Sequence, residues 1–244
     1  MTTPKVFLQG AYSGGVMTTT LNTLGLIPLT QPYSAAPFNY AGVENVTAIP
    51  ANVTDWVLVE LRDATTPTTV VATRAGFLLK DGTITDLDGV SALRFKGTAA
   101  ANYFVAVRHR NHLGIRTAAN QAFVLETNTT YDFTGTQANA YQNVAITTNA
   151  AMAAVSGGKF ALWGGNAANT GSGTTSIRVT GAPVVNDYSA ILSALGSAAV
   201  LNNVYHVADL NLNGNIRVTG SPAVNDYTFL LNVLGTNTSL TQHL

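Results

Sequence analysis

A segment near the end of the chain carries oxygen-bearing side chains at alternate positions. Asp209, Asn211 and Asn213 alternate with leucines, and Gly214 and then Ile216 follow them. This is the opening of an EF-hand-type calcium loop, because such a loop must direct several oxygens at one hard cation and its glycine permits the sharp turn. The spacing therefore predicts a cation site in this segment.

The loop departs from the full EF-hand pattern at its far end. Its twelfth position is Gly220, where a bidentate glutamate is usual, and the nearest downstream carboxylate is Asp226. With two carboxylates we expect weak calcium binding, in the extracellular range of roughly 0.1–1 mM. The alternative is a polar turn in which Asp226 only caps a helix. The predicted ligands are Asp209, Asn211, Asn213 and Asp226.

The run Arg108-His109-Arg110-Asn111-His112 is the second place where chemistry is conceivable. Two histidines and two arginines have the groups to bind phosphate, a sulfated glycan or a metal. If the run is a strand, alternation sends His109 and His112 to opposite faces, unlike paired metal ligands. We therefore favour a structural role at a strand end, with a glycan or anion contact through the arginines as the alternative.

Other acidic residues give no better candidate for catalysis. Asp81, Asp86 and Asp88 could form a minor cation site. The pair Asp81-Gly82, however, favours a β-turn by itself, so we prefer the interpretation as turns. No pair of carboxylates stands out for glycoside hydrolysis. The chain has no glycine-rich phosphate loop, Ser-His-Asp order or HExxH pattern. We therefore predict that the chain is not an enzyme and has no catalytic residue.

The elements that position the loop come from an internal repeat. Residues 177–196 and 216–235 are identical at thirteen of twenty positions, at an offset of 39. Each copy ends in a predicted helix with an asparagine cap, an aspartate in its first turn and a glycine stop. Its apolar residues recur at i, i+3, i+4 and i+7, so we expect the two helices to bury these stripes against each other. Such duplicated loop–strand–helix units, at about 165–197 and 205–236, form a dockerin-like pair.

The first copy of the loop lacks the acids of the second. Residues 166–176 (NAANTGSGTTS) contain no carboxylate, which leaves Asp187 alone. One carboxylate rarely holds calcium in water. We therefore expect calcium as a cofactor of the second repeat only.

The first part of the chain is predicted to form short strands separated by turns. The run 55–62 has apolar side chains on both faces, as in a central strand. In this part of the chain, residues 17–24 are the one segment that we expect to form a helix. We predict a mainly β fold, with an antiparallel β-sandwich over residues 1–150 and the dockerin-like pair over residues 151–244. The candidate strands are 55–62, 69–79, 93–96 and 103–110.

Composition narrows the classes of function. The chain has twelve basic and twelve acidic residues in 244, a net charge of zero and no cysteine. A weakly charged surface repels its own copies weakly, which favours self-association. No basic stripe is available for nucleic acid, and no apolar run approaches the roughly 18 residues of a membrane span. Met1 opens no signal peptide, so we expect a mature or excised form if the protein is exported.

Five ordered motifs, together with the duplicated tail, resemble a module common in large secreted surface proteins of the Bacteroidetes, which are haemagglutinin- or adhesin-like. The resemblance implies export and a cell-surface or extracellular setting, and it supplies no active site. In that family the third loop acid is present, whereas this chain has Asn213. The motifs are LQGAY (8–12), GLIPLTQPY (25–33), DWVLVELRD (55–63), DGTITDLDG (81–89) and VRHRNHLG (107–114).

We therefore expect an extracellular structural or adhesive protein that binds copies of itself and assembles into a filament or surface layer. The alternative is a monomeric carbohydrate-binding adhesin whose partners are surface glycans, and a secreted hydrolase is a third, less favoured class. Exposed aromatic side chains across one sheet face would favour glycan binding. An unpaired edge strand or a donated terminus would favour polymerisation.

Overall fold

The computed structural model describes residues 1–124, 126–168, 175–181 and 185–244. In these residues the largest sheet has six strands in the order β6-β5-β4-β7-β8, with β9 paired to the other end of β7. Every pairing in this sheet is antiparallel. The strands are β4 (Val53–Asp63), β5 (Val70–Leu79), β6 (Ile84–Thr85), β7 (Ala101–His109), β8 (His112–Arg116) and β9 (Gln121–Phe123).

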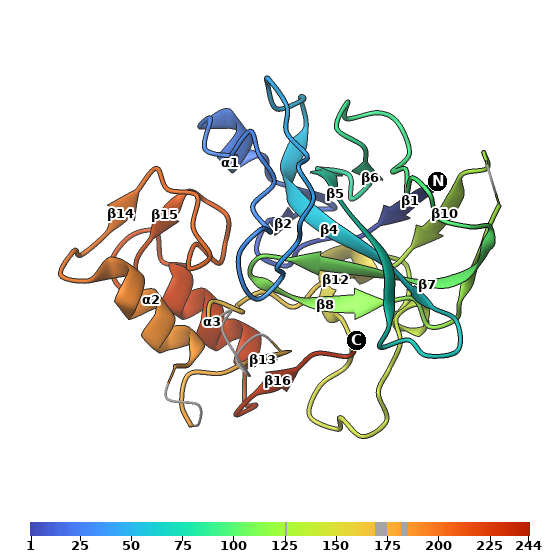
Figure 1. Ribbon diagram of the computed structural model, residues 1–244. Helices are drawn as coiled ribbons and strands as arrows, with labels where there is room; N and C mark the ends of the chain where they lie inside the picture. Colours follow the sequence, from blue (N-terminus) through green and yellow to red (C-terminus); the bar gives the residue numbers. More distant parts are fainter. Residues whose placement is uncertain (125, 169–174, 182–184) are drawn as a thin grey trace.

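The remaining described strands form five two-stranded sheets around the large one (Figure 1). Four of these are antiparallel, whereas β1 (Thr2–Lys5) and β10 (Thr129–Asp132) run parallel. The antiparallel pairs are β2 (Tyr12–Ser13) with β3 (Val16–Met17), β11 (Ala153–Val155) with β12 (Lys159–Ala161), β13 (Ser176–Ile177) with β16 (Leu240–Thr241), and β14 (Leu201–Asn202) with β15 (Asn215–Ile216). The helices are α1 (Thr20–Thr23), α2 (Asp187–Leu195) and α3 (Asp226–Leu234), with short 3-10 turns η1 (Gln137–Asn139) and η2 (Ser156–Gly158).

The prediction of a mainly β chain with antiparallel sheets is confirmed. The finer prediction, of a two-layered sandwich, stays a prediction. Two predicted elements differ from the structure. The run 93–96 makes only a single bridge, from Leu93 to Thr2. The helix expected over 17–24 shortens to α1, because Met17 lies in β3.

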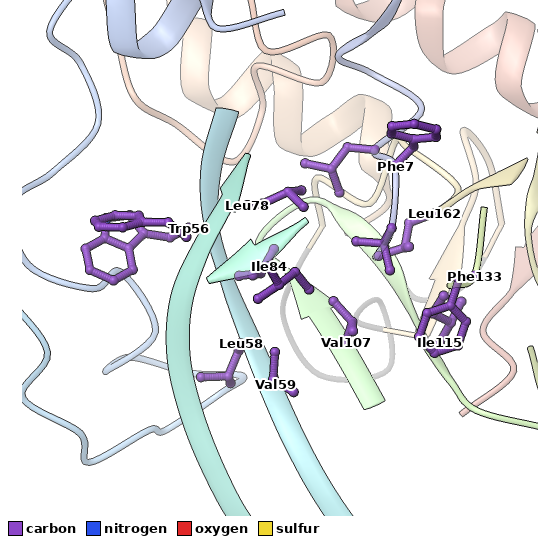
Figure 2. Close-up of a cluster of buried hydrophobic side chains, with 14 of the residues drawn as sticks. Phe7, Trp56, Leu58, Val59, Leu78, Ile84, Val107, Ile115, Phe133 and Leu162 are labelled. Carbon is purple, nitrogen blue, oxygen red and sulfur yellow. The ribbon is translucent and has the colours of Figure 1, made fainter. Parts of the chain in front are cut away.

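Strand β4 is the central strand that its two apolar faces predict. It lies between β5 and β7, and every residue from Val53 to Arg62 is buried. Trp56 packs on Phe77 with ring centroids 4.2 Å apart. Figure 2 shows Trp56 on one side of the β4 and β5 ribbons and Phe7 and Leu162 on the other. The sheet therefore has buried apolar side chains on both faces.

Two clusters of buried apolar side chains divide the chain near residue 165. The first extends through the sheet from Val6 to Leu162, and the second surrounds α2 and α3. Leu212, from the second loop, belongs to the first cluster, and Leu113, from β8, belongs to the second. Each half of the chain therefore inserts a leucine into the core of the other.

The two repeat units also interlock with each other. Strand β13 of the first unit pairs with β16, which follows α3, and β15 of the second unit pairs with β14, which follows α2. The helices begin at the predicted caps, where Asn186 accepts the Ser189 N–H and Asn225 accepts the Thr228 N–H. They lie side by side (Figure 1), and the rings of Tyr188 and Tyr227 are 4.4 Å apart between centroids. The expected packing of helix on helix is present, but the predicted stripes are only partly buried, because Leu192 and Leu231 are 41% and 40% exposed.

The exchange of leucines between the two cores can be tested by truncation. Leu212 is 1% exposed, whereas Leu231, on α3, is 40% exposed. Leu212→Ala is expected to lower the free energy of unfolding by roughly 2–5 kcal/mol, because it leaves a cavity in the main core. Leu231→Ala, the control, is expected to cost less than about 1 kcal/mol. Equal losses in urea titrations of the two variants would contradict the assignment of Leu212 to the main core.

Candidate functional site

The carboxylate of Asp209 closes the second loop on itself. Asp209 is fully buried, and its Oδ1 accepts the Asn213 N–H at 3.0 Å while its Oδ2 accepts the Gly214 N–H at 2.9 Å. Gly214 has a φ of +81°, and a Cβ there would lie 2.8 Å from Leu26 Cδ1. The left-handed backbone conformation favours glycine at this turn, and a larger residue would also have to displace the tip of Leu26.

The two asparagine side chains of the loop also accept backbone N–H groups. Asn211 Oδ1 accepts the Asn213 N–H at 3.2 Å, and Asn213 Oδ1 accepts the Asn215 N–H at 2.8 Å. These contacts fold the loop into successive side-chain-to-backbone turns. Whether their oxygens also bind a cation stays a prediction.

Asp226 joins this loop from the first turn of α3. It is fully buried, its Oδ1 accepts the Leu210 N–H at 2.8 Å, and its Oδ2 accepts the Arg217 N–H at 2.9 Å. Burial raises the pKa of Asp226 to about 6. Burial also raises the pKa of Asp209 to about 7, and the nearby Asp226 charge adds to that rise although Arg110 opposes it. The structure therefore brings all four predicted ligands to one loop.

The oxygen donors of this loop are of the type that a hard cation binds, but only two of the four side chains are carboxylates. Each carboxylate or amide oxygen that accepts one N–H retains a further lone pair. In the described part of the chain no three histidine, cysteine, aspartate or glutamate side chains gather as metal ligands. A cation in this loop would therefore rest on two carboxylates, with amide and backbone oxygens completing the six to eight donors that calcium takes.

The first repeat uses its aspartate in the same structural way. Asp187 Oδ1 accepts the Ala168 N–H at 2.8 Å, and its Oδ2 accepts the Arg178 N–H at 2.7 Å. Arg178 lies nine residues before Asp187, and Arg217 lies nine residues before Asp226. Burial raises the pKa of Asp187 to about 7. Residues 169–174, most of the first loop, lie outside the described residues. The expectation that this copy binds no calcium stays a prediction.

The arginine–histidine cluster is buried, and its two histidines meet. His109 and His112 are each 2% exposed, and their Nδ1 atoms are 3.1 Å apart. The prediction that they face apart is wrong, because the chain reverses at Arg110 and Asn111 and makes the histidines cross-strand partners of β7 and β8. Alternation applies only within one strand, and this run spans two.

The hydrogen bonds around the two imidazoles define a neutral pair. The Gly10 N–H donates to His112 Nε2 at 3.1 Å, so the proton of His112 is on Nδ1, 2.8 Å from Asn111 Oδ1. His109 Nε2 is 3.1 Å from Asp55 Oδ2 and donates to it. Burial lowers the pKa of His109 although Asp55 opposes this. Burial, with the adjoining His109 and the Arg110 charge, lowers the pKa of His112 well below its usual range.

Asp55 is the anion of this cluster. Burial alone would raise its pKa, but the Arg110 charge and the hydrogen bonds of His109 and Tyr205 outweigh burial and hold the pKa at about 2. Arg110 Nε donates to Asp55 Oδ2 at 3.1 Å, and Tyr205 Oη donates to Oδ1 at 2.7 Å. Sequence reasoning missed Asp55 and Tyr205. The available signal was an acid at the start of a predicted strand with apolar side chains on both faces.

The same cluster binds the segment that leads into the second loop. The Arg110 guanidinium lies 4.3 Å from the Tyr205 ring centroid and donates from Nη1 to the His206 carbonyl. Asn111 Nδ2 donates to the carbonyls of Val207, at 3.0 Å, and Asp209, at 2.7 Å. The cluster therefore positions the loop through contacts within the chain.

The remaining acidic candidates form turns and one ion pair. Asp81 Oδ1 accepts the Thr83 N–H at 2.9 Å, and Asp88 Oδ1 accepts the Ser91 N–H at 2.8 Å. Asp86 pairs with Arg74 at 2.7 Å. The three carboxylates therefore have separate partners within the chain, as the turn interpretation expects.

The neutral histidine pair makes stability depend on pH. Because the folded pKa of His112 lies below its unfolded value of about 6.5, its contribution is present above that value and is lost as the pH falls through it. The stability advantage of the native chain over His112→Gln is therefore expected to shrink by about 1–2 kcal/mol between pH 7 and pH 5. Urea titrations at both pH values measure this change. Partial burial and the Arg110 charge also lower the pKa of His206, so His206→Gln measures how much of the change a histidine outside the pair gives. An advantage over His112→Gln that is independent of pH would contradict the neutral pair.

No helix in the described residues has both the length and the apolar character to cross a membrane. Comparison of the chain with models of protein families, with curated proteins and with solved structures finds no match. What the chain does must therefore be argued from its own residues and their contacts.

Proposed function

We propose that the chain is a non-catalytic structural module of an extracellular surface, with a dockerin-like pair of repeats as its tail, and that it associates with copies of itself. The observation that carries the proposal is that the side chains best suited to catalysis are buried in contacts within the chain. Asp55, His109, His112 and Arg110 are buried and bind one another and the tail. A catalytic group needs to reach a substrate atom, and these groups instead join sheet to tail.

The alternative, a monomeric carbohydrate-binding adhesin, has less support. Sugar rings are usually bound by stacking on exposed aromatic faces. All twenty phenylalanine, tyrosine and tryptophan residues lie in the described part of the chain, and each is buried or half-buried. Arg108, the candidate for an anion contact, pairs with Glu60 at 3.3 Å and lies 4.8 Å from the Phe38 ring centroid.

The edges of the large sheet bind other segments of the same chain, which limits how copies could associate. On the outer side of β8, the Leu113 N–H donates to the Trp163 carbonyl at 2.9 Å, and Ile115 bridges to His243. On the outer side of β5, Tyr40 Oη donates to the Thr73 carbonyl at 3.2 Å. The β8 edge, covered in this way, resists pairing with a second copy, whereas β6 pairs with β5 at Phe77 and Leu78 alone. We therefore assign self-association to the uncharged surface and not to strand addition at β8.

The most exposed large apolar side chains lie in three separate segments of the chain. Val43, Val90 and Val144 are 81%, 83% and 90% exposed. Burying such groups between copies is favourable at about 25 cal/mol per Å² of apolar area. Because few charges take part, the association is expected to persist at high salt.

Calcium in the second loop belongs to the same proposal. The cation would lie among Asp209, Asn211, Asn213 and Asp226 and would offset the repulsion between the two buried carboxylates. Its contribution would be to hold the loop against the start of α3. In extracellular fluid, even a site in the range of roughly 0.1–1 mM can be occupied.

Self-association can be measured by light scattering over a range of protein concentrations, in low and in high salt. We expect the average mass to rise with concentration in both. Lysine at Val43, Val90 and Val144 together is expected to reduce the rise, because it places charge in each contact. Threonine at the same positions, which keeps the side-chain shape, is the matched control. A stable monomer at high concentration in both salts would rule the proposal out.

Calcium binding can be measured by titration calorimetry. One site is expected, with a dissociation constant of roughly 0.1–1 mM, and it is expected to be lost in Asp209→Ala and kept in Asp187→Ala. The pair is matched, because both aspartates are buried and both accept two backbone N–H groups. Two equal sites, or a site that survives Asp209→Ala in a folded protein, would refute the assignment.

A further inference from the structure

The second loop contains the one Asn-Gly dipeptide of the chain, Asn213-Gly214. An asparagine followed by glycine is the pair most prone to cyclise, because no side chain hinders the approach of the glycine nitrogen to the asparagine side chain. Asn213 is half-buried, so water reaches it, whereas Gly214 is buried. The fold adds contacts to both reacting groups.

The nucleophile of such a cyclisation is the backbone nitrogen of Gly214. Its N–H donates to Asp209 Oδ2 at 2.9 Å. A carboxylate hydrogen-bonded to an N–H is placed to receive that proton as the nitrogen attacks. The contact comes from a side chain five positions earlier, which a disordered chain does not hold in place.

The electrophile is Cγ of Asn213, and its oxygen is also held. Asn213 Oδ1 accepts the Asn215 N–H at 2.8 Å. Attack at Cγ moves negative charge onto this oxygen, and a fixed N–H donor stabilises that charge, as the donors of an oxyanion hole do. Base and oxyanion donor therefore lie on the two atoms that the reaction needs.

We propose that Asn213-Gly214 is a self-modification site, at which the folded loop promotes conversion of Asn213 to an aspartyl residue. The Gly214 nitrogen forms a bond to Cγ, the Cγ–Nδ2 bond breaks, and Nδ2 leaves as ammonia with the proton that Gly214 gave up. Water then opens the resulting succinimide to an aspartyl or iso-aspartyl residue. The net change is an amide and water converted to a carboxylic acid and ammonia, with no oxidant or reductant.

The product changes the chemistry of the loop. An acid at residue 213 is a third carboxylate beside Asp209 and Asp226, and a higher ligand charge tightens calcium binding. The affinity of Asn213→Asp is expected to exceed that of the native chain by roughly ten-fold. This consequence rests on the proposed calcium site, whereas the conversion itself does not.

The conversion can be followed by mass spectrometry of the peptide that contains residue 213. The folded protein, without calcium, and the urea-denatured protein are incubated at the same pH and temperature. We expect residue 213 to convert at least several-fold faster in the folded chain. Asn211, which leucine follows, reports the background within the same peptide, and Asn213→Gln is expected to remove the signal. A folded chain that converts at the denatured rate or more slowly overturns the proposal.

A second variant tests the role of the fold, and a second measurement tests the consequence. Asp209→Asn, checked for folding by circular dichroism, is expected to convert several-fold more slowly, and an unchanged rate in the folded variant would overturn the assigned role of Asp209. The rise in thermal midpoint with calcium is expected to be larger for Asn213→Asp than for the native chain. If conversion occurs and this rise is equal in both, only the calcium assignment fails.

Discussion

The carboxylate of Asp55 is a buried charge, and a buried charge is tolerated only when it is paired and hydrogen-bonded. Its side-chain partners come from two places in the chain. His109 lies at the end of β7 with Arg110 in the turn that follows, and Tyr205 lies 150 residues beyond Asp55. Asp55 Oδ1 also accepts the Trp56 N–H at 2.8 Å, so the sheet supplies most of the partners and the segment that leads into the second repeat completes them. Sheet and tail have separate apolar clusters, yet they depend on one buried anion.

Each repeat also contains one buried aspartate that joins separate segments of the chain. Asp187 and Asp226 begin their helices and accept the N–H groups of residues on both sides of the preceding loop. This arrangement holds a loop, a strand and a helix together through one carboxylate, to which Asp209 adds two contacts within the second loop. The repeats differ in the loop itself, because only the second carries an aspartate at its first position, Asp209. A shared structural acid and a separate loop acid explain why the units keep their similarity while their loops diverge.

Sequence patterns predicted the features whose causes are local. The helix starts at Asp187 and Asp226 follow from the cap residues, and the central position of β4 follows from its two apolar faces. The contacts of the site were harder to predict, because they join residues far apart. The approach of His109 to His112 depends on a chain reversal at Arg110 and Asn111, where neither glycine nor proline signals a turn. The partnership of Asp55 with Tyr205 spans too much of the chain for any periodicity to reveal it.

The parallel pairing of β1 with β10 affects how the module would respond to mechanical load. Residues Thr2 to Lys5 align with Thr129 to Asp132, and both ends of β1 also bridge to other segments, at Leu93 and Thr83. When tension is applied along a strand in this geometry, the hydrogen bonds of the ladder bear it in shear. They must then break together, whereas bonds peeled from one end break in succession. A load applied along β1 would therefore be resisted by these hydrogen bonds acting together.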